Sequence, residues 1–191
     1  GDLHNFNSKE KGENPPQLII RFGPPPTGEP PPPPASPIPA TVSCGQMLTQ
    51  STLVTNDLSN CLGDGLVIGA PRIIVDLNGR TIDGIGLGSG ILNDGYSTVI
   101  VRNGTVTDFD YGIRLTPESS LSTVESITFR LNQVAAIEAF DADDASIRNN
   151  ILDQNGGGID LVRQQLCDVP AAEASLAHLL DGVEGEARLA E

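Results

Sequence analysis

Aromatic residues are scarce in this sequence. Among 191 residues there is no Trp, and the aromatic fraction is only 4%. A core built around large rings is therefore excluded, and the chain must bury many small aliphatic side chains instead. Such a composition favours a repetitive β architecture, in which small side chains pack in the same way many times over.

Positive charge is also scarce. Lys and Arg number 11 against 25 Asp and Glu, so the formal net charge is -14, and no Lys follows Lys11. A field this negative repels nucleic acid and anionic lipid, and we expect neither as a partner. No apolar run approaches the ~20 residues that a membrane span needs, so no membrane insertion is expected.

No complete catalytic or metal-binding motif is present. His4 and His178 have no Ser, Cys or Asp partner at a spacing typical of a triad, so we expect no catalytic residues and no cofactor. The densest acidic cluster is a candidate Ca²⁺ site, because oxygen-rich clusters suit that ion. It consists of Asp141, Asp143 and Asp144, and its alternative is a solvated corner of the fold.

Proline is concentrated near the start of the chain, where 12 of the 15 prolines lie between Pro15 and Pro39. They isolate one β-prone run, since proline lacks an amide donor and fixes φ. After this run, the composition is that of a polyproline II spacer. We expect the run to dock as a strand, on its own fold or on the sheet edge of a neighbouring molecule. This predicted assembly strand comprises Gln17, Leu18, Ile19, Ile20, Arg21 and Phe22.

Beyond Thr41, short Val/Ile/Thr-rich segments end at Gly, Asn or Asp, and aliphatic residues recur every 22 to 25 positions. Three series share this period: Leu66, Ile91, Ile113, Ile137 and Ile159; Leu77, Val101, Val124 and Ile147; and Ile82, Val106, Phe129 and Leu152. In a parallel β-helix each coil is one repeat, and equivalent side chains stack inside as ladders. A leucine-rich repeat would need more leucines and a helical half-turn, and a β-sandwich has no reason for so long a period.

The period therefore predicts an all-β protein, a short right-handed parallel β-helix of about four to five coils over residues 41–167. Asn78, Asn103 and Asn149 or Asn150 are expected at tight corners, where Asn tolerates a left-handed backbone. Residues 1–40 are expected to form a disordered, Pro-rich leader that carries the strand at 17–22. Residues 168–191 are predicted to form an amphipathic helix that caps an open coil end.

Two cysteines, Cys44 and Cys61, flank a short polar stretch, and their spacing alone allows either a bridge or two free thiols. Around them, residues 42–162 resemble secreted right-handed β-helix proteins of the pectin-lyase-like, NosD-like type. The resemblance is carried by the segments DLNGRTI at 76–82 and VRNGTV at 101–106. It implies a Cys44–Cys61 disulfide near the first coil, but it does not fix an activity, because the fold hosts enzymes, adhesins and structural proteins alike.

From these observations we predict a non-catalytic, extracellular or cell-surface β-helix, the periplasm included, with a structural or self-assembling role. Its expected partner is itself, in a homo-oligomer or filament, with the strand at 17–22 given to a neighbouring subunit. The alternative is a carbohydrate-binding or carbohydrate-active module, similar to a polysaccharide lyase or epimerase. That module would use a polysaccharide and Ca²⁺ at Asp141, Asp143 and Asp144.

Overall fold

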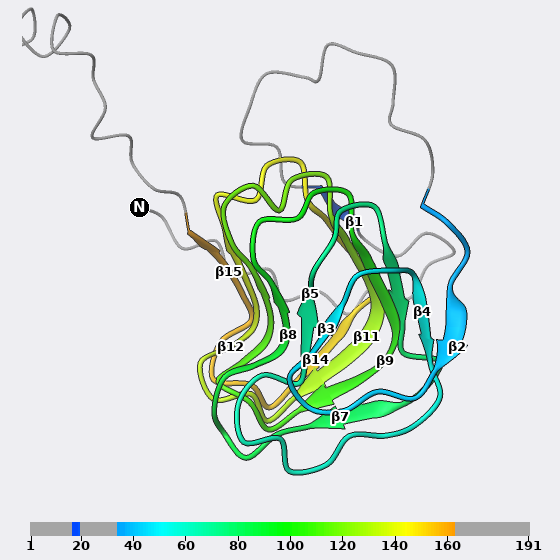
Figure 1. Cartoon of the computed structure of the whole chain (residues 1–191). Coiled ribbons are helices and arrows are strands. Elements are labelled where there is room, and N and C mark those ends of the chain that lie inside the picture. The colour runs from blue at the N-terminus through cyan, green and yellow to red at the C-terminus, as the bar shows by residue number, and fades with distance from the viewer. Residues whose placement is uncertain (1–16, 20–33, 163–191) are drawn as a thin grey trace, which may run out of the picture.

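The computed structural model describes residues 17–19 and 34–162, and all regular structure there is β-strand (Figure 1). A first sheet, sheet A, contains β1 (Gln17–Ile19), β2 (Ile38–Ala40), β4 (Thr52–Val54), β6 (Ile74–Asp76), β7 (Thr81–Asp83), β9 (Ile100–Thr107), β11 (Thr123–Arg130), β13 (Ser146–Arg148) and β14 (Ile151–Asp153). A second, sheet B, contains β3 (Gln46–Leu48), β5 (Leu66–Ile68), β8 (Ser89–Asn93), β10 (Tyr111–Leu115), β12 (Ala135–Phe140) and β15 (Ile159–Val162).

The two sheets are wound by one chain that alternates between them. Sheet A has the order β1-β13-β11-β9-β6-β4-β2, with β14 beside β11 and β7 beside β9, and sheet B has the order β15-β12-β10-β8-β5-β3. Figure 1 views the stack nearly along its axis, so successive coils overlie one another from cyan to orange. The result is a parallel β-helix of about five turns, as the sequence predicts.

Sheet A bends along one line, and in four successive coils a residue with left-handed backbone lies at the bend. These residues are Asn78, Asn103, Ser126 and Asn149, with φ of 52°, 63°, 56° and 57°. Asn pays the smallest cost among side-chain-bearing residues for this conformation. The predicted Asn corners are therefore confirmed. The long strands β9 and β11 run through the bend, whereas the neighbouring coils are divided there into two short strands.

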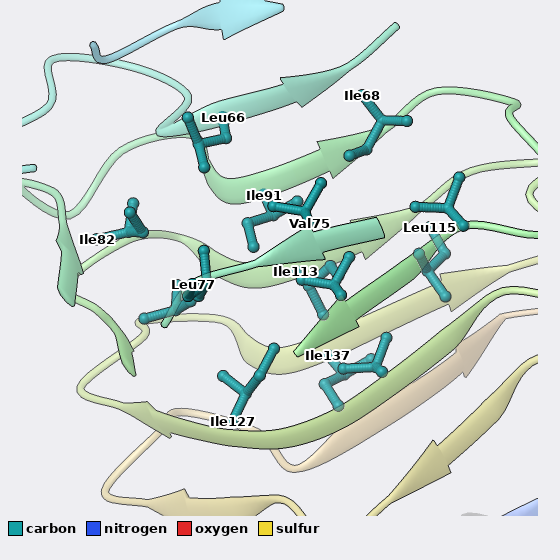
Figure 2. Packing of buried hydrophobic residues seen from close by; sticks show 14 of the residues in the cluster. Leu66, Ile68, Val75, Leu77, Ile82, Ile91, Ile113, Leu115, Ile127 and Ile137 are labelled. Carbon is teal, nitrogen blue, oxygen red and sulfur yellow. The ribbon is translucent and has the colours of Figure 1, made fainter. Parts of the chain in front are cut away.

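Inside the coil, the aliphatic ladders follow the predicted period. Leu66, Ile91, Ile113, Ile137 and Ile159 are in register along sheet B. Ile82, Val106, Phe129 and Leu152 are in register along the bent part of sheet A. Figure 2 shows members of these ladders pointing into the space between the sheets.

The first member of one predicted ladder is wrong by two residues. Val101, Val124 and their equivalents are in register with Val75, and not with Leu77 as the sequence suggested. Leu77 is buried as well, but it lies at the start of the corner that contains Asn78 and Gly79, both with positive φ. Two extra residues at this corner lengthen the repeat, since the five steps from Asp76 to Thr81 lie opposite the three from Arg102 to Thr105. Two buried aliphatic side chains near one corner cannot be told apart by spacing.

The glycines that precede the first ladder have a packing reason. A Cβ at Gly90 would lie 2.1 Å from the Val106 side chain, and a Cβ at Gly112 would lie 2.4 Å from that of Phe129. The third ladder thus occupies the volume that those side chains would need, which explains why the two sequence series recur together.

Candidate functional site

Strand β1 joins the β-helix at the end opposite to the coil that follows it in sequence. It pairs with β13, and Gln17, Leu18 and Ile19 lie opposite Arg148, Ile147 and Ser146. Among the strand pairs of the described residues this one alone is antiparallel. Figure 1 shows β1, in dark blue, beside the last coils and away from β2. The leader strand therefore fills the terminal edge of sheet A.

The filled edge and the rest of the same coil end differ in exposure. Ile147, opposite β1, is only 3% exposed. In the same terminal coil, Ile151, Leu152 and Leu161 are 61%, 38% and 44% exposed. The equivalent residue one coil earlier, Phe129, is fully buried. Strand β1 thus closes one part of this coil end, and apolar side chains remain exposed on the other parts.

The outer face of sheet A carries a row of alternating charge that ends beside the edge strand. Asp76, Arg102, Glu125 and Arg148 are in register on consecutive strands, and Gln17 of β1 comes next. Arg102 Nε lies 2.9 Å from Asp76 Oδ2, and Arg148 Nη2 lies 2.6 Å from Glu125 Oε2. Because like charges on adjacent strands would repel, this alternation favours the observed register.

The N-terminal end of the coil is closed by covalent and amide contacts. Cys44 and Cys61 form a disulfide with Cα atoms 5.4 Å apart, and Cys61 is only 1% exposed. The Asn56 side chain accepts a bond from the Val42 amide at 2.8 Å and donates to the Val42 carbonyl at 3.0 Å. The bridge that the family resemblance implied is therefore present.

The acidic cluster lies in the loop between β12 and β13. Asp141, Asp143 and Asp144 are all partly buried, and Asp141 and Asp144 have φ of 45° and 54°. Across the part of the chain that the structure describes, no three His, Cys, Asp or Glu side chains are grouped to hold a metal ion. Ca²⁺ binding by this cluster stays a prediction.

The outer face of sheet B has two unlike halves. Met47, Val67 and Leu92 form an apolar row on β3, β5 and β8. The same row continues as Arg114, Glu138 and Asp160 on β10, β12 and β15.

Tyr111 lies next to the polar half. Arg114 is ion-paired with Glu138, and its Cζ lies 5.0 Å from the centre of the Tyr111 ring. Burial, and then the nearby charge of Glu138, raise the pKa of the Tyr111 hydroxyl above its usual 10.0. An aromatic ring beside paired charges is suited to a sugar, so this is where the carbohydrate alternative would be tested.

Comparison with protein families agrees with this geometry. Residues 43–169 match the model of the right-handed β-helix region, which is more than half of the chain. The chain belongs to this right-handed β-helix family. No curated protein and no solved structure matches the chain. The family match continues for seven residues past Val162, into residues that the structure does not describe.

Several predicted features of this β-helix fall on residues outside the described part. These are the predicted strand residues Ile20, Arg21 and Phe22, the leader apart from residues 17–19 and 34–40, and the helix at 168–191. Within the described residues, no helix is long and apolar enough to cross a membrane.

Sequence reasoning missed the charged row on sheet A, although a signal for it was present. Asp76, Arg102, Glu125 and Arg148 are separated by 26, 23 and 23 residues, which is close to the period of the aliphatic ladders. Alternating charge at the same period indicates an outward row of a parallel stack as clearly as an aliphatic ladder indicates an inward one.

Proposed function

We propose that this chain is a structural β-helix module of the cell exterior that joins copies of itself by exchanging strand β1. The observation that carries the proposal is the position of β1 on β13, at the opposite end of sheet A from β2. A strand that docks so far from the domain that follows it can dock equally well on a second copy.

Distances along the sheet support this. From β1 to β2 there are six strand spacings, or about 29 Å at ~4.8 Å each. The 18 residues 20–37 include nine prolines, and a polyproline II chain of that length extends about 56 Å at ~3.1 Å per residue. The connector is therefore long enough for docking within one chain, and also for docking between two chains.

If molecules stack end to end, the connector has a shorter distance to span between two chains than within one chain. If the N-terminal coil of one molecule lies on the C-terminal coil of the next, β2 of the donor is within one or two strand spacings of the acceptor's β13, about 5–10 Å. Such a contact joins unlike surfaces and does not close on itself, so repetition builds a filament.

The outer face of sheet A supports a structural role. Four of its charged side chains are engaged with one another, in the pairs Asp76–Arg102 and Glu125–Arg148. Carboxylates and guanidinium groups that neutralise each other along a sheet stabilise the stack. The Cys44–Cys61 disulfide suits an oxidising compartment, which is the reason for placing the protein outside the cytosol.

A disulfide trap tests the proposal directly. Residues opposite each other in an antiparallel pair have Cα atoms about 4.5–5.5 Å apart, which a disulfide can bridge. In a Cys167→Ser background, Gln17→Cys and Arg148→Cys are introduced together and oxidised. We expect covalent dimers and longer ladders on non-reducing gels, and light scattering of the untrapped protein should show mass rising with concentration.

Two controls make the result decisive. Each single cysteine variant should give no ladder, and removal of residues 1–33, which retains β2, should leave a monomer. If the double variant cross-links quantitatively within monomers at every concentration, strand exchange is wrong. Glycan binding with Tyr111→Ala as the control variant then becomes the experiment to make.

A further inference from the structure

Strand β2 is the N-terminal edge of sheet A, and two of its three residues are bonded to β4. The Ile38 amide donates to the Ser51 carbonyl at 3.1 Å, and the Ala40 carbonyl accepts from the Thr55 amide at 3.0 Å. Successive residues of a strand direct their backbone groups to opposite sides. Pro39, which lies between Ile38 and Ala40, therefore faces the free edge of the sheet.

The free edge of β2 consequently has a hydrogen-bond acceptor but no donor. Proline has no N–H, so the one residue of β2 that faces outward presents only its carbonyl oxygen. Pro37, two positions earlier and so on the same side, lacks a donor as well. Pro39 is exposed, and the neighbouring Ile38 is 50% exposed. Among the described strands, β4 is the only partner of β2.

The opposite edge of sheet A is different. Strand β13 contains no proline, and its outer side is paired with β1. Strand β2 is the next described strand after β1 in sequence, whereas β13 lies close to the end of the described residues. Elements that follow each other along a chain are usually neighbours in space. The leader strand therefore passes the nearer edge, which lacks a donor, and pairs with the distant edge, which has one.

We propose that Pro39 determines which edge of sheet A accepts an added strand. It closes the edge at β2, so β13 is the acceptor. The inference deepens the proposed function, and it rests on that function only for docking between two copies. There it makes growth directional, because the leader of one molecule can join only the C-terminal end of the next.

One missing donor is sufficient because the edge is so short. A strand added to β2 would meet a single outward residue, with one carbonyl oxygen and no amide. A carbonyl of the added strand would then have no partner at the point where it leaves water, and an unpaired buried polar group is costly. On β13 the corresponding carbonyl can be satisfied, since each residue of that strand has an N–H.

Pro39→Val in the full-length chain tests the proposal, because Val suits a strand and restores the amide. The first measurement is amide hydrogen exchange at position 39. We expect exchange at least about tenfold slower than in an unstructured peptide, since an added strand now bonds there. The second is the yield of the cross-link between Gln17→Cys and Arg148→Cys in the Cys167→Ser background. It should fall by about half if the leader divides equally between the two edges.

A matched control separates the edge from the loss of a proline. Pro117 is exposed in the turn between β10 and β11, so Pro117→Val makes the same replacement away from any sheet edge and should leave the cross-linking yield unchanged. Pro39→Ala restores the amide without a branched side chain, and it serves if Val disturbs folding. The proposal is wrong if the amide at position 39 exchanges at the unstructured rate, or if the cross-linking yield equals that of Pro117→Val.

The result is separable from the test of strand exchange. Cross-links within one chain and between two chains both report pairing with β13, so the choice of edge is measured even in a monomer. A monomeric protein in which both expected changes occur retains the role of Pro39 and overturns only strand exchange. An assembling protein in which either change is missing retains strand exchange and overturns only the role of Pro39.

Discussion

The two ends of this β-helix are closed in different ways. At the N-terminal end a disulfide and the amide of Asn56 fix the first coil to its neighbour, and Val42 and Leu48 are buried. At the C-terminal end the edge of sheet A is covered by β1, which comes from the opposite end of the sequence, and Leu152 and Leu161 are exposed.

This difference has a functional meaning. Every coil of a solenoid is stabilised by its two neighbours, so the terminal coils need substitutes for the missing one. A covalent substitute is permanent, whereas a three-residue strand held by backbone bonds can be replaced by the same strand from another copy. The N-terminal end thus has a covalent cap, and the C-terminal end has one held by strand pairing alone.

The largest change in the free energy of unfolding should come from shortening a buried side chain in the middle of one ladder, compared with its equivalent in the last coil. Phe129 and Leu152 are in register, but Phe129 is fully buried and Leu152 is 38% exposed. Phe129→Ala should lower the free energy of unfolding by about 3–5 kcal/mol, and Leu152→Ala by less than about 2 kcal/mol. Urea denaturation measures both. Equal losses of unfolding free energy would show that Leu152 is as well buried as Phe129. The difference in burial between the middle of the stack and its C-terminal end would then be wrong.

The second prediction concerns the covalent cap. Replacing Cys44 and Cys61 by Ser together, in a Cys167→Ser background, should cost about 3 kcal/mol, since the bridge closes a 17-residue loop. Hydrogen exchange should accelerate around Val42 and Leu48 and remain unchanged near Ile137. Uniform acceleration along the whole chain would mean that the disulfide stabilises the fold globally and is not a cap of one end.

Most of the coil could be predicted because the same kind of side chain recurs at equivalent positions of successive repeats. Inward positions must be aliphatic in every coil, so the series through Ile113 and the series through Val106 give the register directly. The series through Val101 failed at its first member because Leu77, next to the corner, is also buried and aliphatic. Where a repeat gains a residue at a corner, the period no longer identifies which buried neighbour belongs to the ladder.

The docking edge was beyond prediction for a different reason. The composition and flanking prolines of the run at 17–22 predict a strand, and its first three residues form β1, yet nothing in a β-prone run identifies its partner. Sheet A and sheet B each have two terminal edges, and the composition of the run does not distinguish among them. Its partner β13 lies at the other end of the coil and far along the sequence, where no repeat links the two.

The smallest effect should come from the charged row beside that edge. Glu125→Gln removes the partner of Arg148, which lies opposite Gln17 of β1. We expect a loss of up to about 1 kcal/mol that disappears in high salt, because the pair is partly exposed and screened. Asp160→Asn is the matched control, since it removes the same charge from the other sheet and, at a net charge of -14, only reduces self-repulsion. Thermal unfolding at low and high salt measures both variants. If they shift equally, the alternating row contributes through net charge alone, and the register of sheet A is set by its inward ladders without help from the outer face.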